Sequence, residues 1–263
     1  MTVAQPAAAQ VPTVTPVEAA LHFRVLHLDR VEPDRELIHK LAHIQPDRPA
    51  HARWVEQVEQ LTQELRPLTR PRALFRIDPI VSLEDRRVVL ASGAAFEGAV
   101  GTFLKNATLI ATFVVTIGSA VERLSRIWLR AGKIMQGTIA DAIASQCAEA
   151  TCQTLCRHVR LWAQERACET TPPYSPGYCG MSVRQQIPLF ASLPTERINV
   201  HRTPSCLMLP VKSISGLIGI GPPDKINPQK HPCEACAHPH CTQRRAPCNH
   251  ELAANETTQA TGD

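Results

Sequence analysis

The chain has 263 residues, of which 44% are hydrophobic and only 4% aromatic, and its formal net charge is +4 at pH 7. This length supports a sizeable core, built mostly from Leu, Ile, Val and Ala. The positive charge is small and scattered, with no basic stripe carrying interleaved aromatics, which argues against nucleic-acid binding. The sequence contains no apolar span long enough for a bilayer and no signal-peptide pattern, so we expect a cytoplasmic protein without a membrane partner.

The N-terminal third divides into a leader and a structured portion. Residues 1–18 are mostly Ala, Pro, Thr and Gln without periodicity, which predicts a disordered leader. Residues 19–90 are expected to form an N-terminal α/β portion. Hydrophobic spacing predicts, in chain order, a strand at 21–28, helices at 33–43 and 54–65, and strands at 74–80 and 87–90.

The central portion, residues 91–221, is predicted to be the core of the domain. An apolar helix is expected at 94–104, a strand covered on both faces at 108–117, and a helix at 120–130 with Ser119 and Glu122 as its capping box. The stripe of apolar residues over 134–165 predicts a long central helix. An apolar turn at 187–190 and strands at 198–200 and 207–209 follow. The predicted class is α+β, with a mixed or antiparallel sheet around the central helix.

One short motif stands out in this portion, Ser175-Pro176-Gly177-Tyr178. Proline fixes one backbone angle and glycine frees the next, so the chain can turn sharply and expose main-chain groups to a ligand. Tyr178 would then stand at the rim of the turn with its ring and hydroxyl available. Taken alone, the motif is more typical of an ordinary turn with a packing tyrosine.

The order of four segments gives this motif a context. They are FVVTIGS at 113–119, ADAIA at 140–144 running on to AEA at 148–150, SPGY at 175–178, and the stretch 205–216. Over about residues 90–221 the chain thereby resembles the activation domain of cobalamin-dependent methionine synthase, and especially stand-alone proteins similar to that domain. The resemblance implies binding of S-adenosylmethionine, close to a cobalamin that a partner supplies.

The resemblance also implies roles for particular residues. Glu149 would contact the amino group of S-adenosylmethionine, Tyr178 would orient the donor, and the main chain of Pro176 and Gly177 would contact adenine or ribose. A surface of small residues would face the partner's cobalamin. The full set of implied cofactor-binding residues is Glu149, Pro176, Gly177, Tyr178, Ser213, Ser215 and Gly216, and no catalytic residue is assigned.

One position departs from the family pattern. Five residues before the tyrosine, the family has an arginine that would hold the carboxylate of S-adenosylmethionine, whereas this chain has Pro173. Two interpretations are open. Either another residue holds the carboxylate, with Arg184 a nearby candidate, or binding of S-adenosylmethionine has been lost.

The cysteines of the tail suggest a second site. Cys233, Cys236, Cys241 and Cys248 lie within residues 228–250, which we expect to form a small Cys-rich module after a stiff, proline-rich connection. Four thiolates at this spacing predict a bound metal or cluster. The spacing fits neither common zinc ribbons nor bacterial ferredoxins, so zinc and iron–sulfur both remain open, with iron–sulfur slightly favoured because reactivating a corrinoid requires an electron. Residues 251–263 are predicted to be a disordered tail.

These observations favour a stand-alone reactivation partner of a cobalamin-dependent methionine synthase or a related corrinoid methyltransferase. It would bind S-adenosylmethionine for reductive remethylation of cobalamin carried by another subunit. One alternative is an iron–sulfur redox module that reduces a corrinoid partner without S-adenosylmethionine. Another is a non-catalytic adaptor stabilised by zinc.

Overall fold

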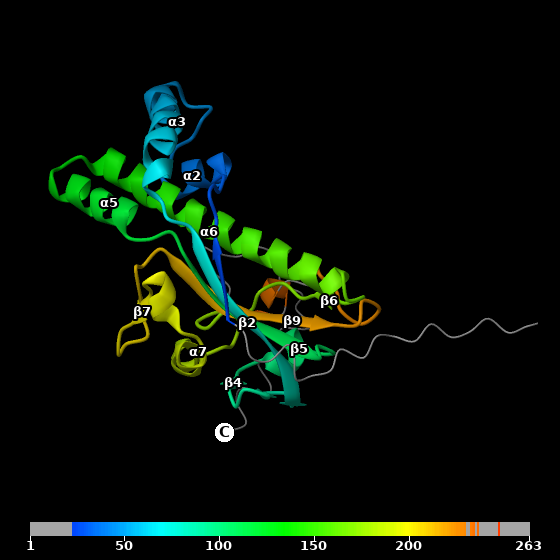
Figure 1. Ribbon diagram of the computed structural model, residues 1–263. Coiled ribbons are helices and arrows are strands. Elements are labelled where there is room, and N and C mark those ends of the chain that lie inside the picture. The colour runs from blue at the N-terminus through cyan, green and yellow to red at the C-terminus, as the bar shows by residue number, and fades with distance from the viewer. Residues whose placement is uncertain (1–22, 230–231, 235, 237–246, 248–263) are drawn as a thin grey trace, which may run out of the picture.

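The computed structural model describes residues 23–229, 232–234, 236 and 247. An antiparallel sheet curls around one side of a long helix, α6 (Ile134–Gln164), as Figure 1 shows. The predicted α+β class, with its long central helix, is confirmed. The predicted leader and terminal tail lie outside the described residues, and so do Cys241 and Cys248.

The main sheet has seven strands in the order β4-β3-β2-β5-β9-β6, with β1 added along β2. Every pairing is antiparallel. A separate small sheet pairs β7 (His201–Arg202) with β8 (Met208–Leu209). The strands of the main sheet are β1 (Arg24–His27), β2 (Arg72–Leu83), β3 (Arg87–Leu90), β4 (Ala95–Glu97), β5 (Leu109–Thr116), β6 (Glu169–Thr170) and β9 (Ser213–Gly221).

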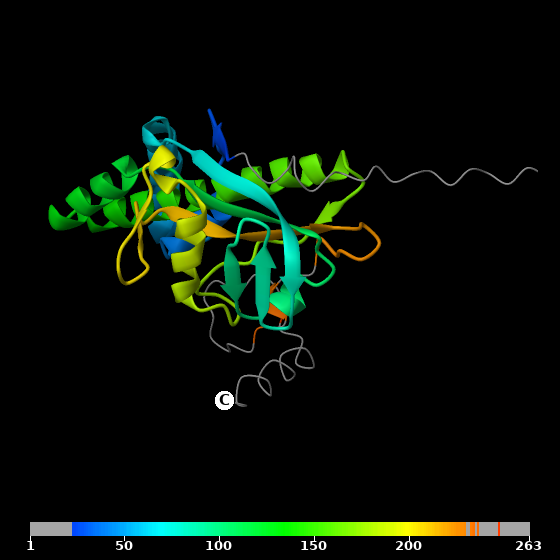
Figure 2. The ribbon, with the colours of Figure 1, turned by 60° about the horizontal axis from the view of Figure 1, so that its bottom comes forward.

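The sheet is covered on both faces, and β5 shows this most clearly. Ala111, Phe113 and Val115 pack in one cluster with the C-terminal half of α6. Ile110 and Val114 point the other way, into a cluster with residues of the 181–200 segment. Figures 1 and 2 show α6 and α7 (Gln186–Ser192) on these opposite faces. Because both sets of side chains are buried, apolar and polar residues do not alternate along β5, as predicted from the sequence.

Helices α2, α3 and α5 pack around the N-terminal half of α6. Helix α5 runs beside it, and Ser125 of α5 donates a hydrogen bond to the carbonyl of Gly137 over 2.8 Å. Within the described ranges, no helix is long and apolar enough to cross a membrane. The remaining helical elements are α2 (Arg35–Leu41), η1 (Pro49–His51), α3 (Ala52–Leu65), η2 (Arg66–Leu68), α4 (Val100–Phe103), α5 (Ala120–Arg130), η3 (Val183–Gln185), η4 (Thr195–Ile198) and η5 (Pro232–Glu234).

The prediction of a helix at 94–104 is wrong. The chain instead forms β4, which pairs with β3, and then the single turn of α4. Gly98 separates the two with φ of 137°, a backbone conformation that interrupts any helix. Phe96 of β4 is fully buried in the cluster below the sheet, so tertiary packing decides the conformation here.

Two further local predictions are corrected. Ser119 makes no capping bond to α5 and instead accepts one from the guanidinium of Arg123, while Glu122 accepts a 2.9 Å bond from the amide of Val211. A long-range contact thus replaces the predicted capping box. The strand predicted at 198–200 is the end of η4, followed by Asn199 with φ of 56°, and the apolar turn at 187–190 lies within α7.

Candidate functional site

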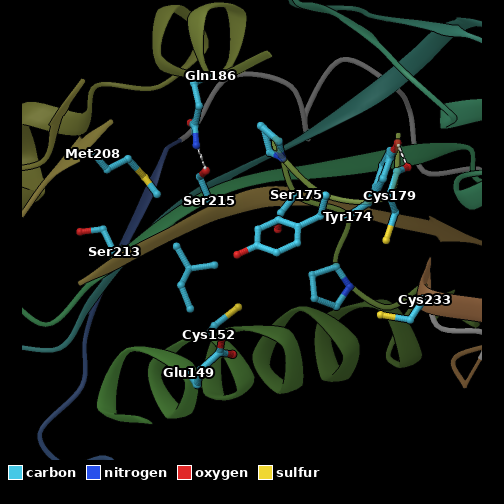
Figure 3. A pocket seen from close by; sticks show the side chains of 14 residues that line it. Glu149, Cys152, Tyr174, Ser175, Cys179, Gln186, Met208, Ser213, Ser215 and Cys233 are labelled. Atoms are coloured by element: carbon cyan, nitrogen blue, oxygen red, sulfur yellow. Dashed lines mark hydrogen bonds between the residues drawn. The ribbon is translucent and has the colours of Figure 1, made fainter. Parts of the chain in front are cut away.

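A pocket of about 200 Å³ lies between α6, β9 and the segment 173–179 (Figure 3). Segments far apart in the sequence meet here, because α6 crosses the sheet face to which β9 contributes. Five of the seven residues that the resemblance implied line this pocket: Glu149, Pro176, Tyr178, Ser213 and Ser215. The arrangement therefore brings the acidic residue of the helix and the Pro-Gly turn to one place.

The helix supplies the pocket's charge. Glu149 is half-buried on α6, and Cys152 lies one turn further along; Figure 3 shows both on the helix side of the cavity. Among the described lining residues, Glu149 is the only one with a charged side chain. A half-buried carboxylate favours a ligand that carries positive charge or hydrogen-bond donors.

Tyr174 attaches the wall formed by the segment 173–179, opposite α6, to the sheet. Its amide donates to the carbonyl of Leu217 on β9 and its carbonyl accepts from the amide of Leu217, each over 2.8 Å. Its buried hydroxyl donates to the carbonyl of Cys179 over 2.9 Å and accepts from the amide of Ala99 over 3.1 Å. One residue thus holds both ends of the segment 174–179, the first through its backbone and the second through its hydroxyl.

Between these fixed points the chain makes the predicted sharp turn. Gly177 has φ of 91°, and its amide donates to the carbonyl of Met181 over 2.8 Å. That amide is used within the turn rather than offered to the pocket, and Gly177 is not a lining residue. Tyr178, in contrast, has 53% of its surface exposed at the rim.

Serine side chains of β9 form the back of the pocket. Ser215 accepts a 2.8 Å bond from the amide nitrogen of Gln186 and donates to the oxygen of the same side chain over 3.1 Å. Ser213 donates to the carbonyl of Pro210 over 2.8 Å. Gln186 and Ser215 are both buried, so their mutual bonds hold α7 against the sheet at the pocket's edge.

The small-residue surface implied for cobalamin is a buried strand. A side chain at Gly216 would come within 2.9 Å of the carbonyl oxygen of Tyr174 and 3.0 Å of the ring of Phe113. The space beside Gly216 is therefore filled by the protein's own atoms, which pack closely because glycine has no side chain. Gly216 does not line the pocket. The exposed apolar side chains beside this strand are Leu207, Leu209 and Val211.

The described lining of the pocket carries no basic side chain. Pro173 lines the cavity, whereas Arg184 is exposed on η3 and is not a lining residue. No lysine or arginine occurs among the described residues of the lining. Lys212, next to the pocket on the chain, is bound to the carboxylate of Asp141 and to the hydroxyl of Ser145 over 2.8 and 2.9 Å.

Sequence reasoning did not assign several lining residues to the pocket, among them Gln186, Cys179 and Cys233. A glutamine before an apolar run and a cysteine directly after Tyr178 were the available signals. Nothing in the sequence pattern indicated that Cys233 of the tail would reach this cavity. Cys233 lies in η5, lines the pocket and is buried.

The predicted four-cysteine metal site remains a prediction. Cys233 and Cys236 are described, while Cys241 and Cys248 lie outside the described residues. In the part of the chain that the structure describes, no group of three or more His, Cys, Asp or Glu side chains is arranged as around a bound metal ion.

Comparison with known proteins finds a family model that matches the part of the chain in which most of this pocket lies. Residues 102–225 match the family model described as the activation domain of vitamin B12 dependent methionine synthase. The chain is activation-domain-like. That range contains Glu149, the 173–179 segment and β9, and so almost the whole pocket of this activation-domain-like protein. A search of curated proteins finds no match.

A solved structure shares the fold of the activation-domain-like chain. It is the crystal structure of the MetH reactivation domain bound to AdoHcy, with a TM-score of 0.58 and 15% sequence identity. The similarity covers 81% of this chain and 82% of that one. That share is larger than the range 102–225, so the shared fold extends beyond the region that matches the family model.

Proposed function

We propose that this activation-domain-like protein binds S-adenosylmethionine in the pocket and serves the reductive remethylation of cobalamin. The cobalamin would be carried by a methionine synthase or a related corrinoid methyltransferase, as a separate partner. The observation that carries the proposal is the meeting of Glu149 with the Tyr178 turn in one cavity, within the region that matches the family model. The similar solved structure, described as bound to AdoHcy, supports the same ligand class.

The charge of the pocket favours the methyl donor over its product. S-adenosylmethionine carries a positive sulfonium and a positive ammonium group, whereas S-adenosylhomocysteine has lost the sulfonium charge. With Glu149 as the charged residue of the described lining, the donor gains more from the pocket than the product does. The absence of lysine and arginine from this lining removes the expected partner of the ligand's carboxylate. We expect that group to point toward solvent.

The size of the pocket sets how the ligand would sit. A cavity of about 200 Å³ is smaller than the roughly 300–1,000 Å³ typical of ligand sites. Part of the ligand would therefore extend past the exposed Tyr178, or the 175–180 turn would move outward. Tyr178 could then contact the ligand with its ring, its hydroxyl or both.

The role of the protein's own residues would be positioning. Bound S-adenosylmethionine supplies an electrophilic methyl group. Glu149 would hold the ammonium end through charge-assisted hydrogen bonds, and Tyr178 would fix the orientation at the rim. Holding the donor in line with its acceptor turns a bimolecular transfer into a nearly unimolecular one.

The test is calorimetric titration of anaerobically purified protein with S-adenosylmethionine and then with S-adenosylhomocysteine. We expect saturable binding that is tighter for the donor. Glu149→Gln should weaken donor binding by roughly tenfold or more, as expected for a hydrogen bond to a charged group. Glu165→Gln, at the exposed end of α6, is the matched control and should bind as the wild type does.

Absence of binding by the wild-type protein, with and without a corrinoid partner, would contradict the proposal. The second candidate is then a redox module that reduces a corrinoid partner without S-adenosylmethionine. Pro173 and the lack of a basic residue in the described lining favour it. Visible absorption of the anaerobic protein would separate it from a zinc-stabilised adaptor, which is colourless.

A further inference from the structure

A second cavity, of about 250 Å³, lies where strand β5 ends and helix α5 begins. Three arginines from two parts of the chain line it: Arg70 shortly before β2, Arg72 at the start of β2, and Arg123 as the fourth residue of α5. Within the part of the chain that the structure describes, these arginines are the only charged residues of the lining. The cavity is therefore strongly electropositive.

The charge of these arginines is not neutralised by the protein. No carboxylate among the described residues forms an ion pair with Arg70, Arg72 or Arg123. The guanidinium of Arg70 donates from one nitrogen to two backbone carbonyls, over 2.9 and 3.1 Å, and that of Arg123 donates from one nitrogen to the hydroxyl of Ser119. A guanidinium has five N–H donors, so most of the donors at this cavity remain available to a ligand.

The central sheet fixes one side of the cavity. Arg72 on β2 pairs with Thr116 on β5, and Thr116 pairs in turn with Ser213 on β9. Residues directly opposite each other in antiparallel strands place their side chains on the same face, so these three form a row across the sheet. Thr116 lines the arginine cavity and is only 1% exposed, and its hydroxyl lies 2.9 Å from that of Ser213, which lines the first pocket. The two cavities are therefore neighbours on one rigid support.

The start of α5 adds to the charge that the arginines set. Gly118, with φ of 76°, turns the chain from β5 into this 11-residue helix. Ser119 stands at the N-cap without making a capping bond, and its hydroxyl instead accepts from Arg123. The amides of the first helical turn have no acceptor within the helix, and together with the helix dipole they favour an anion.

We propose that this cavity binds a phosphate group, held by Arg70, Arg72 and Arg123. A phosphate carries up to two negative charges and several strong acceptor oxygens, which guanidinium groups match in geometry. Its binding would replace repulsion among the arginines with charge-assisted hydrogen bonds. The ligand is either free inorganic phosphate or the phosphate of a larger molecule. The site goes beyond the proposed function, because none of its residues lines the first pocket and its test needs no S-adenosylmethionine.

The experiment is calorimetric titration of the full-length protein with inorganic phosphate, at an ionic strength kept constant with sodium chloride. We expect saturable binding of one equivalent to the wild type. Arg72→Gln and Arg123→Gln should each weaken phosphate binding by roughly tenfold or more, as expected for hydrogen bonds between charged groups. The matched control is Arg130→Gln, which removes the same charge at the exposed far end of α5 and should bind phosphate as the wild type does.

Failure of the wild type to bind phosphate would overturn the proposal, as would equal phosphate affinity in Arg72→Gln, Arg123→Gln and Arg130→Gln. Circular dichroism of each variant without phosphate shows whether a loss of binding reflects unfolding. If the half-buried Arg72 cannot be replaced without unfolding, the exposed Arg70→Gln and Arg123→Gln decide instead. Titration with glycerol 2-phosphate distinguishes the two sources, and either result supports the site. Tighter binding of the ester identifies the phosphate of a larger molecule, and equal or weaker binding identifies the free ion.

Discussion

The two walls of the pocket are held in different ways. The wall made by α6 and β9 belongs to the core, and Ser215 on it is only 3% exposed. The wall made by the 174–179 segment is attached through the backbone and hydroxyl of Tyr174, and it carries the exposed Tyr178. Substitutions of buried residues in the first wall should therefore act mainly on stability, whereas those at the half-buried Glu149 and at the rim of the second wall should act mainly on ligand affinity.

The largest effect is expected for Phe113→Ala. Phe113 on β5 is fully buried beneath α6 and touches the position of Gly216. Its removal leaves a cavity, and we expect a loss of about 3–5 kcal/mol in the free energy of unfolding, measured with urea. The control is Val81→Ala, at an exposed position of β2, where a loss under about 0.5 kcal/mol is expected. Equal losses in the two variants would refute the assignment of β5 to the core.

Tyr174→Phe should have the next largest effect. The change keeps the ring but leaves the partly buried carbonyl of Cys179 and amide of Ala99 without their partner. An unsatisfied buried group costs about 1–3 kcal/mol, which urea denaturation would detect. Because the hydroxyl also fixes the end of the turn, donor affinity should fall as well. An unchanged free energy of unfolding in this variant would mean that the turn does not need the hydroxyl of Tyr174 to keep its conformation.

Tyr178→Phe is the matched change on the exposed side of the same segment. We expect the free energy of unfolding to change by less than about 0.5 kcal/mol, since Tyr178 is largely exposed. If its hydroxyl contacts the ligand, donor affinity in calorimetry should fall roughly twofold to tenfold, the value of one neutral hydrogen bond. A larger loss of stability than of affinity would reverse the proposed division between the walls.

The smallest effect is expected at the ion pair between α6 and β6. Arg160 donates two 2.9 Å bonds to Glu169. Burial acts to raise the pKa of the Glu169 carboxyl, but the bonds from Arg160 and from the Thr170 amide outweigh it and hold the pKa below its ordinary value of 4.5. Because Arg160 is half exposed, Arg160→Gln should cost only about 0.2–1 kcal/mol at pH 7.

The pH dependence of this pair has a definite sign. A carboxyl with a lowered pKa in the folded state contributes stability above the unfolded pKa, and loses it as the pH falls through the folded pKa. The difference between wild type and Arg160→Gln should therefore be constant above about pH 5 and disappear in more acidic buffer. A difference that grows on acidification would contradict the pairing.

Most of the elements could be predicted from the sequence because their patterns are local. The apolar stripe of α6 and the unbroken apolar run of β5 each identify an element without knowledge of its neighbours. The predictions failed where a distant contact decides the conformation. Glu122 bonds to Val211 instead of capping α5, and Phe96 pairs into the sheet instead of continuing a helix.

The pocket was predictable in part for the same reason. Glu149 and Tyr178 could be named from the order of segments that the resemblance supplied, and both line the cavity. Gln186 and Cys233 could not be named, because only the packing of α7 and η5 brings them there. Gly216 was assigned to a ligand contact, whereas the backbone of Tyr174 occupies the space above it.

The position of β9 in the sheet also determines when the pocket can exist. β9 lies between β5 and β6, and its residue Ile220 pairs with Leu109 while Ser213 pairs with Thr116. Such pairings have high contact order, which slows folding because a long loop must close before they form. During synthesis on the ribosome, β5 and α6 emerge well before β9, the strand that covers the free edge of β5. A truncation before residue 213 would expose the edge of β5 that pairs with β9 and would remove the back of the pocket.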